Sequence, residues 1–246
     1  MNSGARLLIV GAGGLGSPLA LALAVEPCVA QITLIDADVV ELSKLHRQIL
    51  LTTAQLGKPK VDAALTTLSH RCSRLTPAEP SLRIVPRAER LTPKNSQALF
   101  ADHDLVIDGS DDLDTKFLVN DTACAAGMPA LIGGIVRFSG QLQTIWPGSA
   151  CYRCLFEDPP PPGSALSCQQ AGVLGPACGV VAGLMAHEVL AILRGQPRLA
   201  GSVLTLDLLR WQQRRIGLSR RLDCSACAAA PSTARGRKID SLASPS

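Results

Sequence analysis

Short apolar runs alternate with amphipathic segments along the first half of the chain. Buried strands are predicted at Leu7–Val10, Gln31–Ile35, Leu82–Val85, Asp104–Ile107 and Pro129–Ile132. Helices are predicted at Ser17–Val25, Lys60–Arg74 and Leu113–Ala126. This β-α alternation predicts a Rossmann-like α/β fold, in which helices cover both faces of a doubly wound, mostly parallel sheet.

The pattern changes after Gly133-Gly134. Strands are predicted at Gly140–Ile145 and, as the last strand, at Val203–Leu206, in an antiparallel C-terminal part of the fold. Between them, four consecutive prolines make Asp158–Gly163 a loop, and Cys178–Leu193 predicts an apolar helix.

The composition indicates one globular domain. A chain of 246 residues is long enough for one sizeable core. Because 47% of the residues are hydrophobic and only 3% are aromatic, we expect that core to be aliphatic. The few aromatic residues argue against a nucleic-acid platform, and no stretch is expected to reach the ~18 apolar residues of a membrane span. We therefore expect a cytoplasmic protein that binds neither nucleic acid nor membrane. Residues 228–246 are small and polar, and we expect them to be a disordered tail.

The net charge is +4, and the basic excess collects late in the chain. The arginines concerned are Arg210, Arg214, Arg215, Arg220 and Arg221. Two interpretations remain open for them: a solvated face, or a surface that docks an acidic protein.

A glycine-rich turn follows the first predicted strand. Gly11, Gly13, Gly14 and Gly16 lie between that strand and a helix, the setting in which such a turn holds a phosphate at the helix N-terminus. Asp36 ends the next strand, about 20 residues further on, where a carboxylate binds ribose hydroxyls. These features predict nucleotide binding, but a dinucleotide and ATP would both fit them.

Charged residues further along the chain favour ATP. A hydride-transfer site does not need the cations Arg47 and Lys60, whereas the charge of a triphosphate must be neutralised before a weak nucleophile can attack it. Asp111 follows the fourth predicted strand, at the edge of the sheet where ligands bind, and can hold Mg²⁺ together with phosphate oxygens. Arg47, Lys60 and Asp111 are therefore candidate catalytic residues.

Two cysteine pairs, Cys151-x-x-Cys154 and Cys224-x-x-Cys227, predict a metal site. In a reducing compartment, two such pairs present four thiolates to a tetrahedral Zn²⁺. Because four thiolates leave no open coordination position, we expect the zinc to be structural. Four further cysteines fall in apolar or helical surroundings and are expected to be buried: Cys28, Cys72, Cys124 and Cys178.

In chain order, the stretches GAGGLG, LIDAD, LSKLHRQ, GKPK, DGSDD, DTKFLVND, CYRC and CSAC resemble the motifs of the MoeB/ThiF/HesA enzymes, bacterial relatives of the ubiquitin-activating enzyme. The resemblance implies a single ThiF/MoeB-type adenylation domain over residues 1–227. It implies an adenylyltransferase that uses ATP and Mg²⁺ on the C-terminal glycine of a small ubiquitin-like sulfur carrier protein ending in Gly-Gly. Pyrophosphate leaves, and thiocarboxylation follows. A homodimer, a structural zinc and a sulfurtransferase as sulfur donor are also implied.

The resemblance further implies which residues line the nucleotide site: Gly14, Asp36, Ser43, Lys44, Arg47, Lys60, Asp111 and Asp112. Cys168 matches a cysteine that forms a thioester or acyl-disulfide in some members of the family and is dispensable in others. Lys44 and Asp112 each stand where an Asn is usual, and Lys116 and Phe117 replace a common Arg-Tyr pair. We hypothesise that Lys44 and Asp112 pair with each other, or through bound Mg-ATP.

The implied chemistry needs no general base, because the attacking carboxylate is already ionised at pH 7, and catalysis is alignment plus charge neutralisation.

Three alternative functions remain open. One is a noncatalytic homologue that binds a carrier or a nucleotide, and another is an enzyme that adenylates a peptide in natural-product biosynthesis. The third is an NAD-dependent oxidoreductase, which the stretches around Lys60 and Asp111 disfavour.

Overall fold

The computed structural model describes residues 4–75, 82–161 and 172–232. Within them, eight strands form one sheet in the order β3-β2-β1-β4-β5-β6-β7-β8. The strands are β1 (Ala5–Val10), β2 (Val29–Ile35), β3 (Arg83–Arg87), β4 (Leu105–Asp108), β5 (Ala130–Val136), β6 (Ser139–Ile145), β7 (Ser202–Asp207) and β8 (Gln212–Gly217). Strands β1 to β5 pair in parallel, and β5 to β8 pair antiparallel. The predicted α/β fold with an antiparallel C-terminal part is therefore confirmed.

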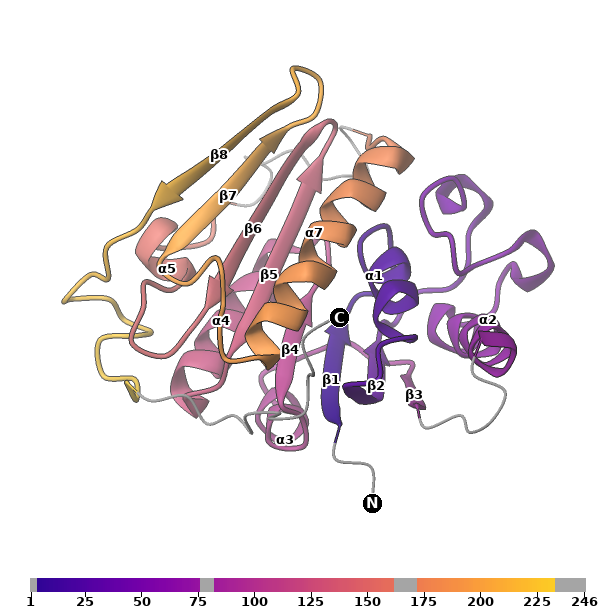
Figure 1. Ribbon diagram of the computed structural model, residues 1–246, viewed down its shortest axis with the longest axis horizontal. Coiled ribbons are helices and arrows are strands. Elements are labelled where there is room, and N and C mark those ends of the chain that lie inside the picture. The colour runs from indigo at the N-terminus through magenta and orange to yellow at the C-terminus, as the bar shows by residue number, and fades with distance from the viewer. Residues whose placement is uncertain (1–3, 76–81, 162–171, 233–246) are drawn as a thin grey trace, which may run out of the picture.

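Helices cover both faces of this sheet (Figure 1). The helices are α1 (Gly16–Leu23), α2 (Lys60–Leu75), α3 (Ser96–Ala101), α4 (Leu113–Ala126), α5 (Tyr152–Leu155) and α7 (Gly175–Leu193), and two 3-10 turns are η1 (Leu42–Lys44) and η2 (Thr53–Gln55). Helices α1, α2 and α7 bury their apolar residues in one cluster, and α3, α4 and α5 bury theirs in a second cluster on the opposite face. The core is aliphatic, as predicted: leucines and isoleucines make up most of its largest fully buried side chains.

The edge strand β8 was not expected. It pairs with β7 along its whole length, yet all of its residues, QQRRIG, are exposed. The prediction that Val203–Leu206 is the last strand is therefore wrong, because a strand exposed on both faces carries no alternation of apolar and polar positions.

Strand β5 runs through Gly133-Gly134, where the sequence predicted a change of structure. A Cβ atom at Gly133 would lie 2.5 Å from Sδ of Met185, so a larger residue here would have to displace the Met185 side chain of α7. Helix α7 is long and apolar enough to cross a membrane by length and composition, contrary to expectation, but 61% of its apolar window is buried inside the fold.

The chain remains hydrogen-bonded beyond the expected domain end at residue 227. The backbone amides of Ala228 and Ala230 donate to the carbonyl groups of Cys224 and Cys227. Residues 233–246, the rest of the expected tail, lie outside the described residues.

Candidate functional site

The glycine-rich turn lies at the carboxyl edge of the parallel strands. Gly11 follows β1 with a φ of +89°, and a Cβ atom there would lie 3.1 Å from the backbone of Ser110, which follows β4. A glycine is therefore needed both for this backbone conformation and for the close approach of the two loops. Strands β1 and β4 thus end together, the place where open α/β sheets bind ligands.

Asp36 holds this turn in place. Its Oδ2 accepts a hydrogen bond from the amide of Ala12 and its Oδ1 accepts one from the amide of Asp38, each at 2.8 Å. Each carboxylate oxygen can accept a further hydrogen bond, so the predicted contact with ribose hydroxyls remains open to it.

A cavity above this turn, here called the inner cavity, brings together most of the predicted nucleotide-binding residues. These are Gly11, Gly13, Gly14, Asp36, Lys44, Arg47, Lys60, Asp111 and Asp112. Gly16 and Ser43 do not line it: Gly16 starts α1, and Ser43 is exposed in η1. Cys168 lies outside the described residues.

The lysines of the inner cavity are held by acidic residues. Lys60 Nζ donates to Oδ2 of Asp38 at 2.8 Å and lies 3.6 Å from Oδ2 of Asp36. The hydrogen bond from Lys60 lowers the pKa of Asp38, so this carboxylate stays ionised at neutral pH. Lys44 donates to Oε1 of Glu41 at 2.6 Å and lies 4.0 Å from Asp38.

The hypothesised direct pair between Lys44 and Asp112 is not formed. The carboxylate of Asp112 accepts hydrogen bonds from the amide and the hydroxyl of Thr115, at 2.9 and 2.5 Å, and so caps α4. Glu41 is closer to Lys44 because the short η1 turn brings residues three apart onto one side. Lys44 and Asp112 nevertheless line the same cavity.

Gln48 is a residue that the site prediction missed. It lines the inner cavity and is only 2% exposed, yet its Oε1 is buried with no hydrogen-bond partner among the described residues. A buried polar atom without a partner is costly, so this one indicates a ligand or an ordered water. The signal in the sequence was its place directly after Arg47 in LSKLHRQ.

A second cavity, here called the groove, adjoins the inner cavity and runs across β5, β6 and β7. The two cavities share the residues Ser110, Asp111, Asp112 and Ile135. Gly133 and Gly134 line the groove where it meets the inner cavity, and a Cβ atom at Gly134 would lie 3.8 Å from Cε of Lys116. Further out it passes Phe156, Asp158 and the hairpin of β7 and β8.

Lys116 joins the strand ends at this junction. Its Nζ donates to Asp108 Oδ2 at 2.7 Å, to the carbonyl oxygen of Ser110 at 2.8 Å and to that of Gly133 at 2.6 Å. Asp108 in turn accepts hydrogen bonds through Oδ1 from the amide and hydroxyl of Ser110. One buried ammonium group therefore links the end of β4, the loop that carries Asp111, and β5.

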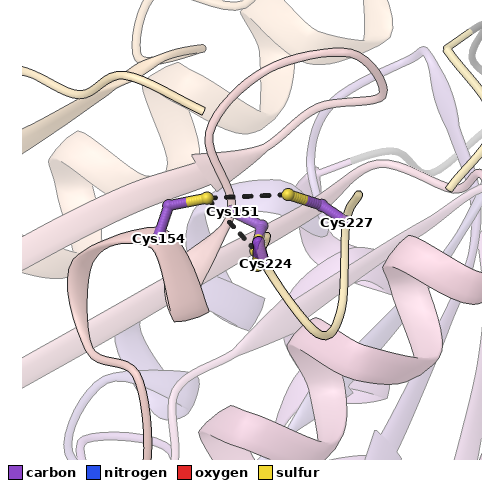
Figure 2. Close-up of side chains that lie close together, drawn as sticks. All are labelled: Cys151, Cys154, Cys224 and Cys227. Carbon is purple, nitrogen blue, oxygen red and sulfur yellow. Dashed lines mark hydrogen bonds between the residues drawn. The ribbon is translucent and has the colours of Figure 1, made fainter. Parts of the chain in front are cut away.

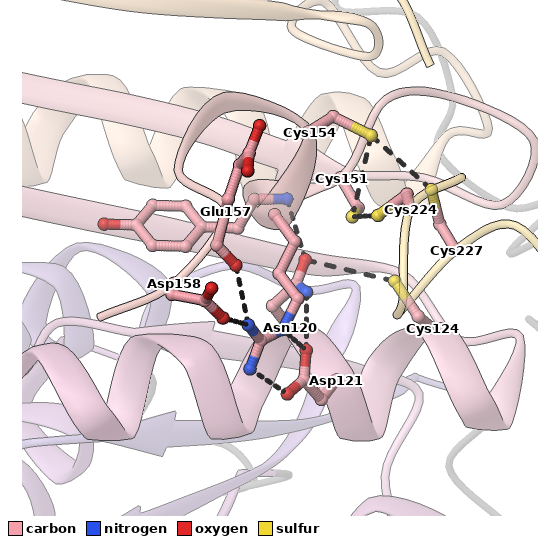
Figure 3. Close-up of polar contacts among 11 residues, drawn as sticks. Asn120, Asp121, Cys124, Cys151, Cys154, Glu157, Asp158, Cys224 and Cys227 are labelled. Carbon is pink, nitrogen blue, oxygen red and sulfur yellow. Dashed lines mark hydrogen bonds and ion pairs between the residues drawn. The ribbon is translucent and has the colours of Figure 1, made fainter. Parts of the chain in front are cut away.

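Helix α4 also anchors the segment Phe156 to Asp158, which lines the groove. Figure 3 shows Asn120, Asp121 and Cys124 on this helix, close to the segment that contains Cys151 and Cys154. Asp121 binds the guanidinium of Arg153 through both oxygens, at 2.8 and 2.9 Å. The same guanidinium donates to the carbonyl of Glu157 and to Asp158, so it holds the chain as it leaves α5.

The four predicted metal ligands meet at one point (Figure 2). The Sγ atoms of Cys151, Cys154, Cys224 and Cys227 all lie within 4.8 Å of one another, with Cys151 to Cys224 at 3.6 Å and Cys154 to Cys227 at 3.5 Å. Tetrahedral zinc with bonds of about 2.3 Å places its sulfur ligands about 3.8 Å apart. The residues therefore fit a tetrahedral ion. Burial raises the pKa of Cys154, so metal binding here would release protons.

Comparison with known proteins gives a family and several relatives. The family model described as ThiF family matches residues 3–226. The sulfur carrier protein adenylyltransferase of Thermus thermophilus is 39% identical over 234 residues, which cover 92% of this chain and 83% of that protein. Adenylyltransferase and sulfurtransferase MOCS3 of Sus scrofa is 44% identical over 230 residues, and the match covers 92% of this chain but only 49% of that protein.

Solved structures confirm the fold. The crystal structure of E. coli MccB with ATP superposes with a TM-score of 0.77 at 20% sequence identity, over 92% of this chain and 68% of that one. At this identity the likeness concerns the fold alone.

Proposed function

The chain belongs to the ThiF family, and on this premise we propose that it is an adenylyltransferase that activates a small sulfur carrier protein. In the reaction that we propose, the C-terminal glycine carboxylate of the carrier attacks the α-phosphate of ATP. An acyl-adenylate forms, pyrophosphate leaves, and thiocarboxylation follows. The observation that carries the proposal is the junction of the two cavities, because a reaction between a nucleotide and a polypeptide end needs two sites that meet.

The inner cavity suits the triphosphate. Lys44, Arg47 and Lys60 line it and supply the positive charge that stabilises phosphate oxygens in the transition state. Asp111 is exposed and lines both cavities, and no described residue forms an ion pair with it. One free carboxylate together with phosphate oxygens is the ligand set that Mg²⁺ prefers. We propose that Asp111 holds Mg²⁺, which would neutralise charge on the phosphates.

The groove suits an extended polypeptide end. At its junction with the inner cavity it is lined by Gly133 and Gly134, and Gly134 leaves the space in front of Lys116 without a side chain. We propose that a Gly-Gly end reaches the junction here. Its carboxylate is ionised at neutral pH and needs no base, so the rate depends on alignment and on the surrounding charge.

Three further features belong to the same proposal. The cysteine cluster holds a structural zinc, the protein acts as a cytoplasmic homodimer, and a sulfurtransferase delivers the sulfur. The sulfurtransferase is supported by the name of the MOCS3 relative, of which this chain spans about half.

The test is ATP–pyrophosphate exchange driven by a panel of small ubiquitin-like proteins that end in Gly-Gly, beginning with the sulfur carrier of the Thermus thermophilus relative. We expect carrier-dependent exchange that Lys60→Met and Asp111→Asn each lower at least a hundredfold, because each removes charge at the phosphates. Lys58→Met is the matched control, since Lys58 is exposed, does not line the inner cavity and lies two positions from Lys60.

Other outcomes would point to other functions. Binding of ATP in calorimetry without exchange with any carrier would indicate a noncatalytic homologue. Binding of NAD in place of ATP would refute the proposal.

A further inference from the structure

The polar side chains where the groove meets the inner cavity are mostly engaged within the protein. The hydroxyl of Ser110 donates to Asp108 at 2.6 Å. Lys116 uses its three N–H groups on Asp108 and on the carbonyls of Ser110 and Gly133. Neither can donate to a bound molecule without breaking a hydrogen bond that it already makes.

Tyr152 is different. It lines the groove and is only 5% exposed, yet no described residue hydrogen-bonds its hydroxyl. The hydroxyl oxygen itself is not among the buried polar atoms that lack a partner, so the burial of this residue concerns its ring. Because no described residue engages this hydroxyl, it is available to hydrogen-bond a molecule in the groove.

The phenol ring is held from several sides. It lies edge-on to Phe117, with ring centroids 5.2 Å apart and an interplanar angle of 76°, and it meets Phe156 at 5.0 Å. The backbone amide of Tyr152 donates to Oδ1 of Asn120 at 2.8 Å. The cysteines Cys151 and Cys154 flank it in sequence. A group fixed in this way loses little entropy when it binds.

We propose that the Tyr152 hydroxyl binds the polypeptide substrate by donating a hydrogen bond to a backbone carbonyl near the substrate's C-terminus. This assignment rests on the proposed function. Every extended chain offers backbone carbonyls, so such a contact would recognise a glycine-rich end that has no side chains to read. Tyr152 is a binding residue in this proposal and takes no part in bond formation.

The first test is Tyr152→Phe, which keeps the ring and its packing and removes only the hydroxyl. We expect the KM for the carrier protein in pyrophosphate exchange to rise about three- to tenfold, the size of one neutral hydrogen bond. The kcat and the KM for ATP should not change, because the contact is made equally in the ground and transition states. Thr66→Val is the control for loss of a hydroxyl: Thr66 lies on α2, lines neither cavity, and its hydroxyl donates to the carbonyl of Asp62.

The second test is spectroscopic and uses the fact that the chain has one tyrosine. Protein grown with 3-fluorotyrosine should give one ¹⁹F resonance. This resonance should move when a synthetic octapeptide ending in Gly-Gly is added to saturation and should stay unmoved with ATP alone.

An unchanged carrier KM in Tyr152→Phe, or a resonance that does not respond to the saturating peptide, would overturn the assignment of Tyr152 alone. Absence of carrier-dependent exchange in the unmodified protein would instead overturn the proposed function, and the assignment with it.

Discussion

The buried ion pair between Lys116 and Asp108 allows a quantitative prediction. Lys116 Nζ lies 2.7 Å from Asp108 Oδ2, and the two side chains are 7% and 0% exposed. Lys116→Met keeps an unbranched side chain of similar length but removes the charge, which leaves a buried carboxylate without a counter-charge. Loss of one partner of a buried pair typically lowers the free energy of unfolding by about 3–5 kcal/mol.

Urea denaturation measures this loss directly. In a chain of this size, the expected loss in the free energy of unfolding corresponds to a fall in Tm of about 6–20 °C, because each kcal/mol shifts Tm by about 2–4 °C. The matched control is Arg210→Met. Arg210 forms an ion pair with Asp207 at 2.8 Å, but the side chains are 70% and 31% exposed, so the expected loss is below about 1 kcal/mol.

A double variant separates charge from packing. In Asp108→Asn/Lys116→Met both charges are gone, and the amide oxygen of Asn can still accept hydrogen bonds from Ser110. Because two buried charges are themselves costly, the double variant should recover most of the lost stability. The reasoning would be refuted if Lys116→Met cost no more than Arg210→Met, or if the double variant were less stable than the single one.

The remaining predictions concern pH, backbone space and metal. Burial lowers the pKa of His103, so the unfolded chain takes up a proton below about pH 6.5 that the folded chain does not bind, and the free energy of unfolding should fall between pH 7.5 and pH 5.5. In urea denaturation this fall should be smaller in His103→Gln, and an equal fall would exclude His103 as its source. Gly16→Ala should abolish soluble expression, because a Cβ atom there overlaps the carbonyl of Gly11. Gly179→Ala, with open space in α7, should raise the free energy of unfolding by about 0.5–1 kcal/mol. Cys224→Ser should lower the zinc content from one equivalent per chain in atomic absorption, and an unchanged content would contradict the proposed ligand set.

Much of the fold could be predicted because parallel strands are buried on both faces and read as continuous apolar runs, as in LLIV of β1. Edges were harder. Strand β3 continues through Pro86, which the sequence places outside the strand, because an edge strand tolerates a residue that cannot donate. Strand β8 carries no apolar pattern at all, since both of its faces are exposed.

The candidate site was predictable where backbone geometry alone brings residues together. Gly11, Asp36 and Asp111 meet because they follow β1, β2 and β4, and the carboxyl ends of parallel strands share one edge of the sheet. Side-chain partners were not predictable in this way. The choice of Glu41 by Lys44 depends on a single 3-10 turn, and the burial of Lys116 depends on strands that arrive from both sides of α4 in the sequence.

The inner cavity and the groove have one wall in common, Ser110 to Asp112, and this wall can couple the binding of their occupants. If a molecule in one compartment shifts this short loop, it changes the affinity of the other compartment, and linkage requires the effect to be equal in both directions. Under the proposed function, this coupling alone would be enough to make the nucleotide and the carrier bind in a preferred order.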